Sequence, residues 1–432
     1  MNKITLFVLL FLTVVNSNAQ ENTWTLEQCI ALGLENSFEV KIKQIEIKRT
    51  QKSHNSMVNN LLPTVGFDAN KSYNFGSTID PSTNGRVSSN IQYDNFFLSA
   101  RMNLIDFNTL ATSQFTKLDI ERAKVEQEVL ENEYKLQIAE SFFTALYTQE
   151  LLKIQESQIE NAKSNLERIQ KEENIGSKPK SDLYDMQLSL ALEEKTILET
   201  KQLLQIQKRQ LFQLLNADTI EIDGLILIPY FSSNSNQNST LFSNPKVRLA
   251  QLVYELGQKR IKQQRGNNLP TLSAFYNYST FYYRPLNQPD IMVNSFNNQL
   301  SDNKNQQVGL QLSIPIFNGF KNTRNVKALK FQNEKEAIAI KQEDLKLKQQ
   351  IQLEEEKIEQ IELLDTKLIA IKELTQKTFQ TSQSKFEAGK IDAIVFSTVK
   401  NQLLQSEYDV LKTNLQRQFL AVKLNLLKFN AL

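Results

Sequence analysis

The sequence predicts a mostly helical fold with a smaller β contribution, in which a plan of helix, strand, strand, long helix and helix occurs twice. Three observations lead to this fold class: long stretches without helix breakers, four short stretches of alternating polarity, and an internal repeat. Glycine (11) and proline (9) are scarce in the 432 residues. Such a composition is typical of long uninterrupted helices.

The internal repeat rests on short motifs that recur in the same order, each displaced by roughly 210 residues. The matched pairs are Leu62-Pro63-Thr64 with Leu269-Pro270-Thr271, Phe107-Asn108 with Phe317-Asn318, Gly176 with Gly389, and Asn36 with Asn244. One such match could arise by chance, but four in order indicate duplication. We therefore expect a first repeat at 20–216, a linker at 217–243 and a second repeat at 244–432.

Four stretches of about ten residues alternate between apolar and polar side chains, which predicts strands with one face of each kind. We place them at 64–75, 96–106, 271–283 and 306–316. This is the length of strand that crosses an outer membrane at a tilt. The same alternation also fits a soluble two-sheet domain, in which the two faces would be core and surface.

Long helices are predicted between and after the strand pairs. A helix opens at Thr25 and runs to about Asn59, and two coiled-coil hairpins occupy about 108–216 and 320–430. Apolar residues in the first hairpin recur at mostly three-, four- and seven-residue spacing, which indicates a coiled-coil seam. Each first helix would be about 100 Å long at 1.5 Å per residue. The glycines Gly176 and Gly389 mark the tight turns at the hairpin tips.

The N-terminus has the pattern of a signal peptide, covering 1–19. Lys3 precedes an apolar run that is too short to span a bilayer, and Ala19 supplies the small residue before cleavage. The alternative is a buried N-terminal helix. No later segment has about 18 consecutive apolar residues, which excludes a helical inner-membrane protein.

The charge balance and the rare residue types exclude several functions. The net charge of +2 does not indicate a basic surface that would bind nucleic acid. With one cysteine (Cys29) and one histidine (His54), we expect no disulfide, metal site or nucleophilic set, and hence neither a cofactor nor an enzyme. We expect Cys29 to be a buried packing residue and His54 to lie on a helix surface.

Four membrane strands cannot close a barrel alone, because open edges in lipid leave backbone groups unsatisfied. Eight strands are about the minimum for a closed outer-membrane barrel. Copies of the chain must therefore share one barrel, with the long helices side by side below it.

At this point the residues resemble the TolC family of outer-membrane efflux proteins, over essentially the whole mature chain. The segments that carry the resemblance are Trp24 to Ile30, Leu62-Pro63, Leu269-Pro270, Ser313 to Gly319 and Phe386 to Asp392. The resemblance implies a homotrimer with a twelve-stranded barrel in the lipid of a Gram-negative outer membrane, above a long periplasmic α-helical barrel. It also implies a passive exit duct that docks a periplasmic adaptor (membrane fusion protein) and an inner-membrane pump or ABC exporter, for efflux or type I secretion.

The resemblance assigns two kinds of site at the hairpin tips. Acids just past the tip turns would form a periplasmic gate; the candidates are Asp182, Asp185 and Asp392. The second half departs from the family here, since Val395 stands at the position equivalent to Asp182. The adaptor would contact the tip residues Gly176, Ser177, Lys178, Gly389 and Lys390. The alternatives are acids that favour a helix N-terminus and ordinary exposed turns.

The alternation of the strands assigns the barrel lumen to Asp68, Asn70, Arg101, Asn103, Gln311 and Ser313. Arg101 supports this choice of face, because a lipid-facing Arg near the midplane would cost about 2–4 kcal/mol.

The competing hypothesis for the whole chain is a soluble periplasmic coiled-coil adaptor or tether. An adaptor would need one hairpin flanked by compact β-domains, whereas this chain has two equivalent hairpins.

Overall fold

The structure is a computed structural model that describes residues 23–53, 57–79, 84–88, 90–217, 220–229, 244–286 and 292–429. The predicted signal peptide, His54 and most of the predicted linker lie outside these residues. The described chain divides into two compact units. Each unit combines segments from both predicted repeats, because long helices and strand pairs from the two halves pack together.

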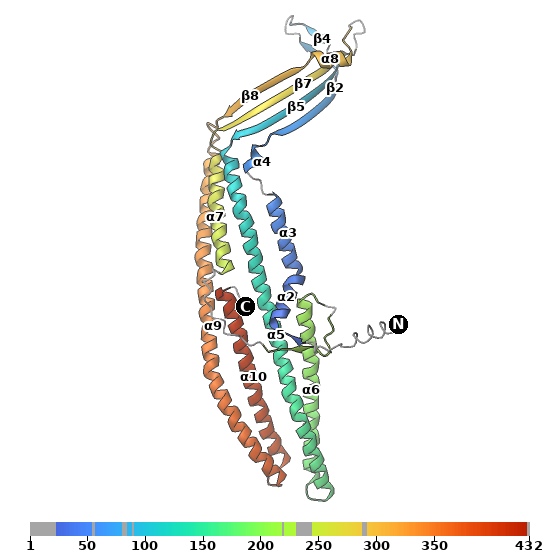
Figure 1. Ribbon diagram of the computed structural model, residues 1–432, viewed down its shortest axis with the longest axis vertical. Helices are drawn as coiled ribbons and strands as arrows, with labels where there is room; N and C mark the ends of the chain where they lie inside the picture. The colour runs from blue at the N-terminus through green and yellow to red at the C-terminus, as the bar shows by residue number, and fades with distance from the viewer. Residues whose placement is uncertain are drawn as a thin grey trace, which may run out of the picture. The chain divides into compact units, whose positions relative to one another are not determined.

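The first unit contains residues up to 45, 125–248 and 342–432. Its main elements are two helical hairpins (Figure 1). One is formed by α5 (Phe107–Asn174) and α6 (Lys180–Leu214), the other by α9 (Lys321–Glu387) and α10 (Ala393–Phe429). Helix α2 (Leu26–Asn36) and the short parallel pair β1 (Thr23–Trp24) and β6 (Ile226–Leu227) complete the unit. The mostly helical fold with two long hairpins confirms the predicted fold class.

The core of the first unit lies where α2, both hairpins and β6 meet. Phe142, Phe212 and Leu227 are among its fully buried side chains. Gln149 fastens β6 to α5, since its amide donates to the Leu227 carbonyl at 2.8 Å and accepts from the Leu227 N–H at 2.9 Å. The described start of the linker, 220–229, is therefore anchored to the first hairpin.

The second unit contains residues 46–124 and 249–341. Its sheet has the antiparallel order β2 (Thr64–Asn74), β5 (Ile91–Ile105), β7 (Thr271–Pro285), β8 (Asn305–Ser313). A small hairpin of β3 (Ser77–Ile79) and β4 (Arg86–Ser88), helix α4 (Met57–Leu61), helix α8 (Phe296–Asp302) and most of α7 (Pro245–Gly266) accompany it. The two predicted strand pairs thus join at β5 and β7 into one sheet.

The predicted helix from Thr25 to Asn59 is wrong as a single element. Thr25 caps α2 with a reciprocal hydrogen-bond pair, accepting from Gln28 N at 3.3 Å while Thr25 N donates to the Gln28 side chain at 2.9 Å. Ser37 then leaves the helical region at φ −56°, ψ 119°. Its hydroxyl accepts from Val40 N and starts the new helix α3 (Phe38–Ser53). A serine that caps the next helix interrupts the first one.

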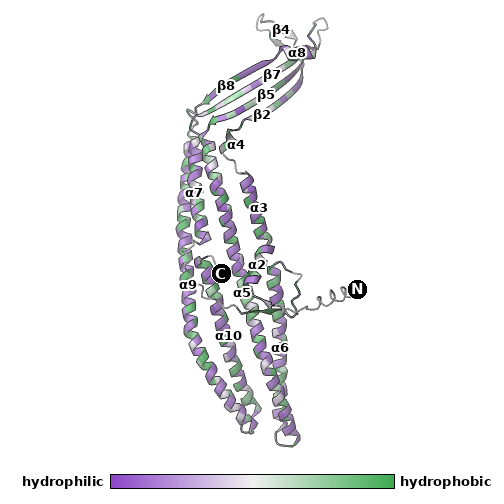
Figure 2. Cartoon of the chain, in the orientation of Figure 1, coloured by the Kyte–Doolittle hydropathy of each residue, from purple (hydrophilic) through white to green (hydrophobic). Residues whose placement is uncertain are grey.

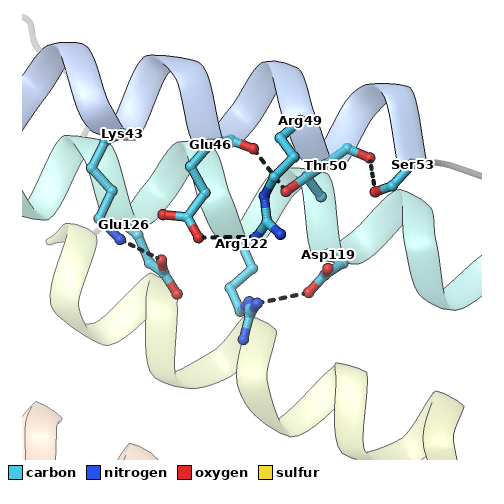
Figure 3. A network of polar contacts seen from close by, with 8 residues as sticks. All are labelled: Lys43, Glu46, Arg49, Thr50, Ser53, Asp119, Arg122 and Glu126. Atoms are coloured by element: carbon cyan, nitrogen blue, oxygen red, sulfur yellow. Dashed lines mark hydrogen bonds and ion pairs between the residues drawn. The ribbon is translucent and has the colours of Figure 1, made fainter.

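Helix α3 makes ion pairs with α5 and within itself (Figure 3). In the first unit, Lys43 Nζ lies 3.1 Å from Glu126 of α5. In the second unit, Arg49 pairs with Glu46 at 3.4 Å within α3, and Arg122 pairs with Asp119 at 2.9 Å within α5. Of these three pairs, Lys43–Glu126 connects α3 to the long helix that follows the strands.

The strand bounds also differ from the prediction, most clearly at the start of β5 and the end of β8. Strand β5 begins at Ile91 rather than Phe96, because its first residues pair with both β2 and β7. Strand β8 ends at Ser313, whereas the prediction carried it to Ile316. Pro315 has no N–H to donate to a ladder, so the strand stops before it.

Candidate functional site: the hairpin tips and the polar face of the sheet

The turn of the first hairpin has the geometry of a Schellman motif. Gly176 has a φ of +75°, and its N–H donates to Glu173 O while Ser177 N donates to Glu172 O, both at 2.8 Å. Glycine is required because side-chain-bearing residues disfavour this left-handed conformation. The motif satisfies carbonyls at the end of α5 and leaves Gly176 and Ser177 exposed.

The candidate gate residue Asp182 is buried at the start of α6. Its carboxylate lies 3.5 Å from Lys178 Nζ, and both side chains are only 12% exposed. The candidate contact residue Lys178 is therefore engaged inside its own tip rather than extended into solvent. Asp185, almost one turn further along α6, is half-buried.

The turn of the second hairpin repeats the same backbone. Gly389 has a φ of +69°, its N–H donates to Phe386 O at 3.0 Å, and Lys390 N donates to Lys385 O at 2.8 Å. Asp392, however, is exposed and accepts from Val395 N at 2.8 Å. It is the capping residue of α10, as in the alternative assignment of this acid.

An aromatic cluster, which the sequence analysis missed, joins the two tips. The rings of Phe386 and Phe396 stack at 4.5 Å with an interplanar angle of 4°. Ile169 of α5 and Met186 of α6 pack against this pair. The signal in the sequence is one phenylalanine on each side of the Gly389 turn. We call Ile169, Met186, Phe386, Ala393 and Phe396 the tip cluster.

Two cations of the first hairpin lie over the ring of Phe386. The Arg168 guanidinium is 4.6 Å and the Lys178 ammonium 5.8 Å from its centroid. Cations are attracted to the face of an aromatic ring, more strongly when water is excluded. The structure thus brings Lys178 and Asp182 together with the second hairpin, while Asp392 is occupied with its own helix.

All six candidate lumen residues lie on one face of the sheet. Paired residues on neighbouring strands point to the same side, and side chains alternate along each strand. The register pairs Asn103 with Ser273 and Ser273 with Gln311, and it sets Arg101, Asp68, Asn70 and Ser313 in the same alternating set. We call this the polar face. Arg101 Nη2 donates to Gln311 Oε1 at 2.6 Å and to Ser273 Oγ at 3.2 Å.

The opposite face is apolar. Its members include Val65, Phe67, Leu98, Ala100, Leu272, Ala274, Val308, Leu310 and Leu312. Hydrophobic and hydrophilic residues alternate along the strands accordingly (Figure 2). On the outer strands these apolar side chains are largely uncovered: Val308 is 82% and Phe67 65% exposed. A water-soluble sheet would cover such a face.

Outside these regions, Cys29 is a packing residue. It is fully buried on the inner side of α2, and burial, with the charge of Glu27 second, raises the pKa of its thiol to about 12. In the part of the chain that the structure describes, no three His, Cys, Asp or Glu side chains gather as a metal site. Among the same residues, no helix has both the length and the apolar composition needed to cross a membrane.

Residues 30–217 match the outer membrane efflux protein family. No curated protein matches the chain. Several solved structures share the fold over 93% of this chain. VceC from Vibrio cholerae superposes with a TM-score of 0.75 at 13% identity, over 94% of its own chain. The outer membrane channels CmeC of Campylobacter jejuni and MtrE of Neisseria gonorrhoeae give TM-scores of 0.71 and 0.72, each at 14% identity and over 85% and 88% of their chains.

Proposed function

Because residues 30–217 match the outer membrane efflux protein family and the chain shares the fold of outer-membrane channels, we propose that it is a channel subunit of a tripartite efflux or type I secretion system. In this proposal the protein is a passive duct, with neither enzymatic activity nor a cofactor. It works as a homotrimer in a Gram-negative outer membrane, with its helices in the periplasm. The signal peptide 1–19 would direct its export.

The observation that carries the proposal is the sheet with one polar and one uncovered apolar face. Its outer strands β2 and β8 each pair on one side only within the described chain. In lipid every unpaired backbone group costs several kcal/mol, so a four-stranded sheet with two open edges cannot sit there alone. Pairing β2 of one copy with β8 of the next would satisfy both edges and close a common barrel.

The helices supply a second argument for several copies. In the first unit, large apolar side chains stay exposed along α6 and along α9. On α6 they include Tyr184, Leu188, Leu192, Leu203 and Ile206; on α9 they include Leu345, Leu353, Leu363, Ile371 and Leu374. Two such stripes on one chain match an assembly in which α9 of each copy packs beside α6 of the next.

The tips are the proposed contact with a periplasmic adaptor, and through it with an inner-membrane pump or ABC exporter. Gly176, Ser177, Gly389 and Lys390 are exposed and are the candidate contact residues. Lys178 contributes by holding Asp182. The acids Asp182 and Asp185 remain the candidates for a periplasmic gate, whereas Asp392 serves as a helix cap.

A matched pair of variants tests the proposal in cells. Val308→Arg places a charge on the apolar face, and Gln307→Arg places the same charge one residue away on the polar face. In a lipid-facing position the charge costs about 2–4 kcal/mol per copy. We expect Val308→Arg to lose outer-membrane insertion in fractionation, and Gln307→Arg to keep it.

The unaltered protein should be recovered from the outer membrane and should conduct in a planar bilayer. Recovery as a soluble periplasmic monomer would contradict the duct and favour the coiled-coil tether. Equal tolerance of both arginine variants would show that the apolar face does not meet lipid.

A further inference from the structure

The polar face of the sheet is almost uncharged. Over the described strands β2, β5, β7 and β8, its side chains are mainly amides and hydroxyls, such as Asn70, Asn103, Asn277, Gln307 and Gln311. The two charged residues on this face are Arg101 and Asp68. A face with so few charges gives each of them a large share of the local potential.

Hydrogen bonds to strands β7 and β8 fix the position of the Arg101 guanidinium. Its guanidinium reaches from β5 over Ser273 of β7 to Gln311 of β8, at 3.2 and 2.6 Å. Both acceptors are neutral, so they fix the position of the positive charge without cancelling it. Beside them the ring of Phe275 covers Gly309, where a Cβ would approach the ring to 2.7 Å. The charge is therefore positioned on the face and remains exposed.

Asp68 lies too far along the sheet to neutralise Arg101. The cross-strand partner of Arg101 on β2 is Thr64, four residues from Asp68. At about 3.3 Å per residue this is roughly 13 Å, which exceeds the Debye length of about 10 Å at 0.1 M salt. The charges of Arg101 and Asp68 therefore lie at different positions along the strands, and neither cancels the potential of the other.

Resting on the proposed trimeric duct, we propose that Arg101 is the charge-selecting residue of its strand region and favours small anions over cations. Three copies would place three fixed guanidinium groups in one ring, and rings of Arg or Lys select anions in pores. Asp68 forms the opposing, cation-favouring ring. Cargo with exposed carboxylate or phosphate groups would pass the Arg101 ring more readily than cationic cargo of equal size.

Arg101 could instead serve only to tie β5 to β8, and the two roles give different results on substitution. Arg101→Lys keeps the charge but loses the planar fork that reaches two acceptors. A selecting role predicts unchanged selectivity in this variant. A purely structural role predicts that Lys and Gln at this position behave alike.

The test is the reversal potential of the purified full-length protein in a planar bilayer, between 0.1 M and 0.3 M KCl. We expect Arg101→Gln to raise the potassium-to-chloride permeability ratio by about two- to fivefold, as three unit charges about 10 Å from the ion would produce in water. Asp68→Asn should lower the ratio. Arg101→Lys should leave it unchanged, and at 1 M salt the differences should shrink towards zero.

Lys71→Gln is the matched control, because it removes the same charge from β2 on the opposite, apolar face. Lys71 pairs with Asp94 in the register, and its ammonium lies 5.7 Å from the Tyr73 ring. A shift of equal size in this control, or no shift in a conducting Arg101→Gln channel, overturns the inference. If Arg101→Gln does not assemble, Arg101→Ser removes the same charge and is measured in its place. An unaltered protein that never conducts contradicts the proposed duct itself.

Discussion

The two hairpin tips share one backbone and use their acids differently. Both turns are Schellman motifs with a glycine near φ +70°. At the first tip, Asp182 is buried against Lys178, whereas at the second tip Asp392 is exposed and caps α10. The two tips therefore share the turn but not the electrostatics, and an acid near a tip glycine does not by itself indicate a gate.

The tip cluster accounts for this difference. Phe386 of the second hairpin lies under Arg168 and Lys178 of the first. The charged groups of the first tip are thus anchored on an aromatic surface that the second tip supplies. The second tip is left with its acid in solvent. The second tip supplies the aromatic ring, and the first tip supplies the cations that pack on it.

The largest loss of stability at the tips should follow from removing the Phe386 ring. Phe386→Ala deletes a fully buried ring that stacks on Phe396, and such truncations cost about 3–5 kcal/mol. Hydrogen exchange of both tips in the assembled protein measures the loss. Ile175→Ala at the 80% exposed position beside the first turn is the control and should change little. Protection lost at the second tip alone would show that the first tip does not depend on Phe386.

Substitution of the turn glycines should destabilise the two tips by a smaller amount, which should be the same at both. Gly176→Ala and Gly389→Ala each force a side chain into the left-handed region, at about 1–2 kcal/mol. A Cβ at either glycine would meet no atom within 4 Å, so the cost is conformational in both. Hydrogen exchange should report matching losses, with Ser177→Ala as the neutral control. Clearly unequal losses would mean that the turns are not equivalent.

The smallest loss of stability is expected from substitution of the tip acids, and it should differ between Asp182 and Asp392. Asp182→Asn leaves Lys178 without its counter-charge in a largely buried place and should cost about 1 kcal/mol, since breaking an ion pair costs less when water can reach it. Asp392→Asn should cost less than about 0.5 kcal/mol, because Asn caps helices as well as Asp does. The same exchange experiment compares them. A reversed order would contradict the assignment of Asp392 as a cap.

The sequence was sufficient for the features that depend on periodicity. Alternation placed Arg101, Asp68 and Gln311 on one side of the sheet, and glycine placement located both tip turns. Local side-chain competition was harder to foresee: Ser37 starts a new helix where the apolar pattern continues, and Pro315 ends β8 within an apolar run. Lys178, which pairs with Asp182, lies over a ring more than 200 residues away in the chain, and local patterns do not encode that contact.

The mass of the protein in mild detergent tests most directly whether several copies close a common barrel, as we propose. The mature chain would be extracted from outer membranes and its mass corrected for bound detergent. A shared barrel of three copies predicts a mass near three times that of the mature chain. A monomer that still binds and inserts into lipid would contradict it, because a single open sheet would then be stable in the membrane.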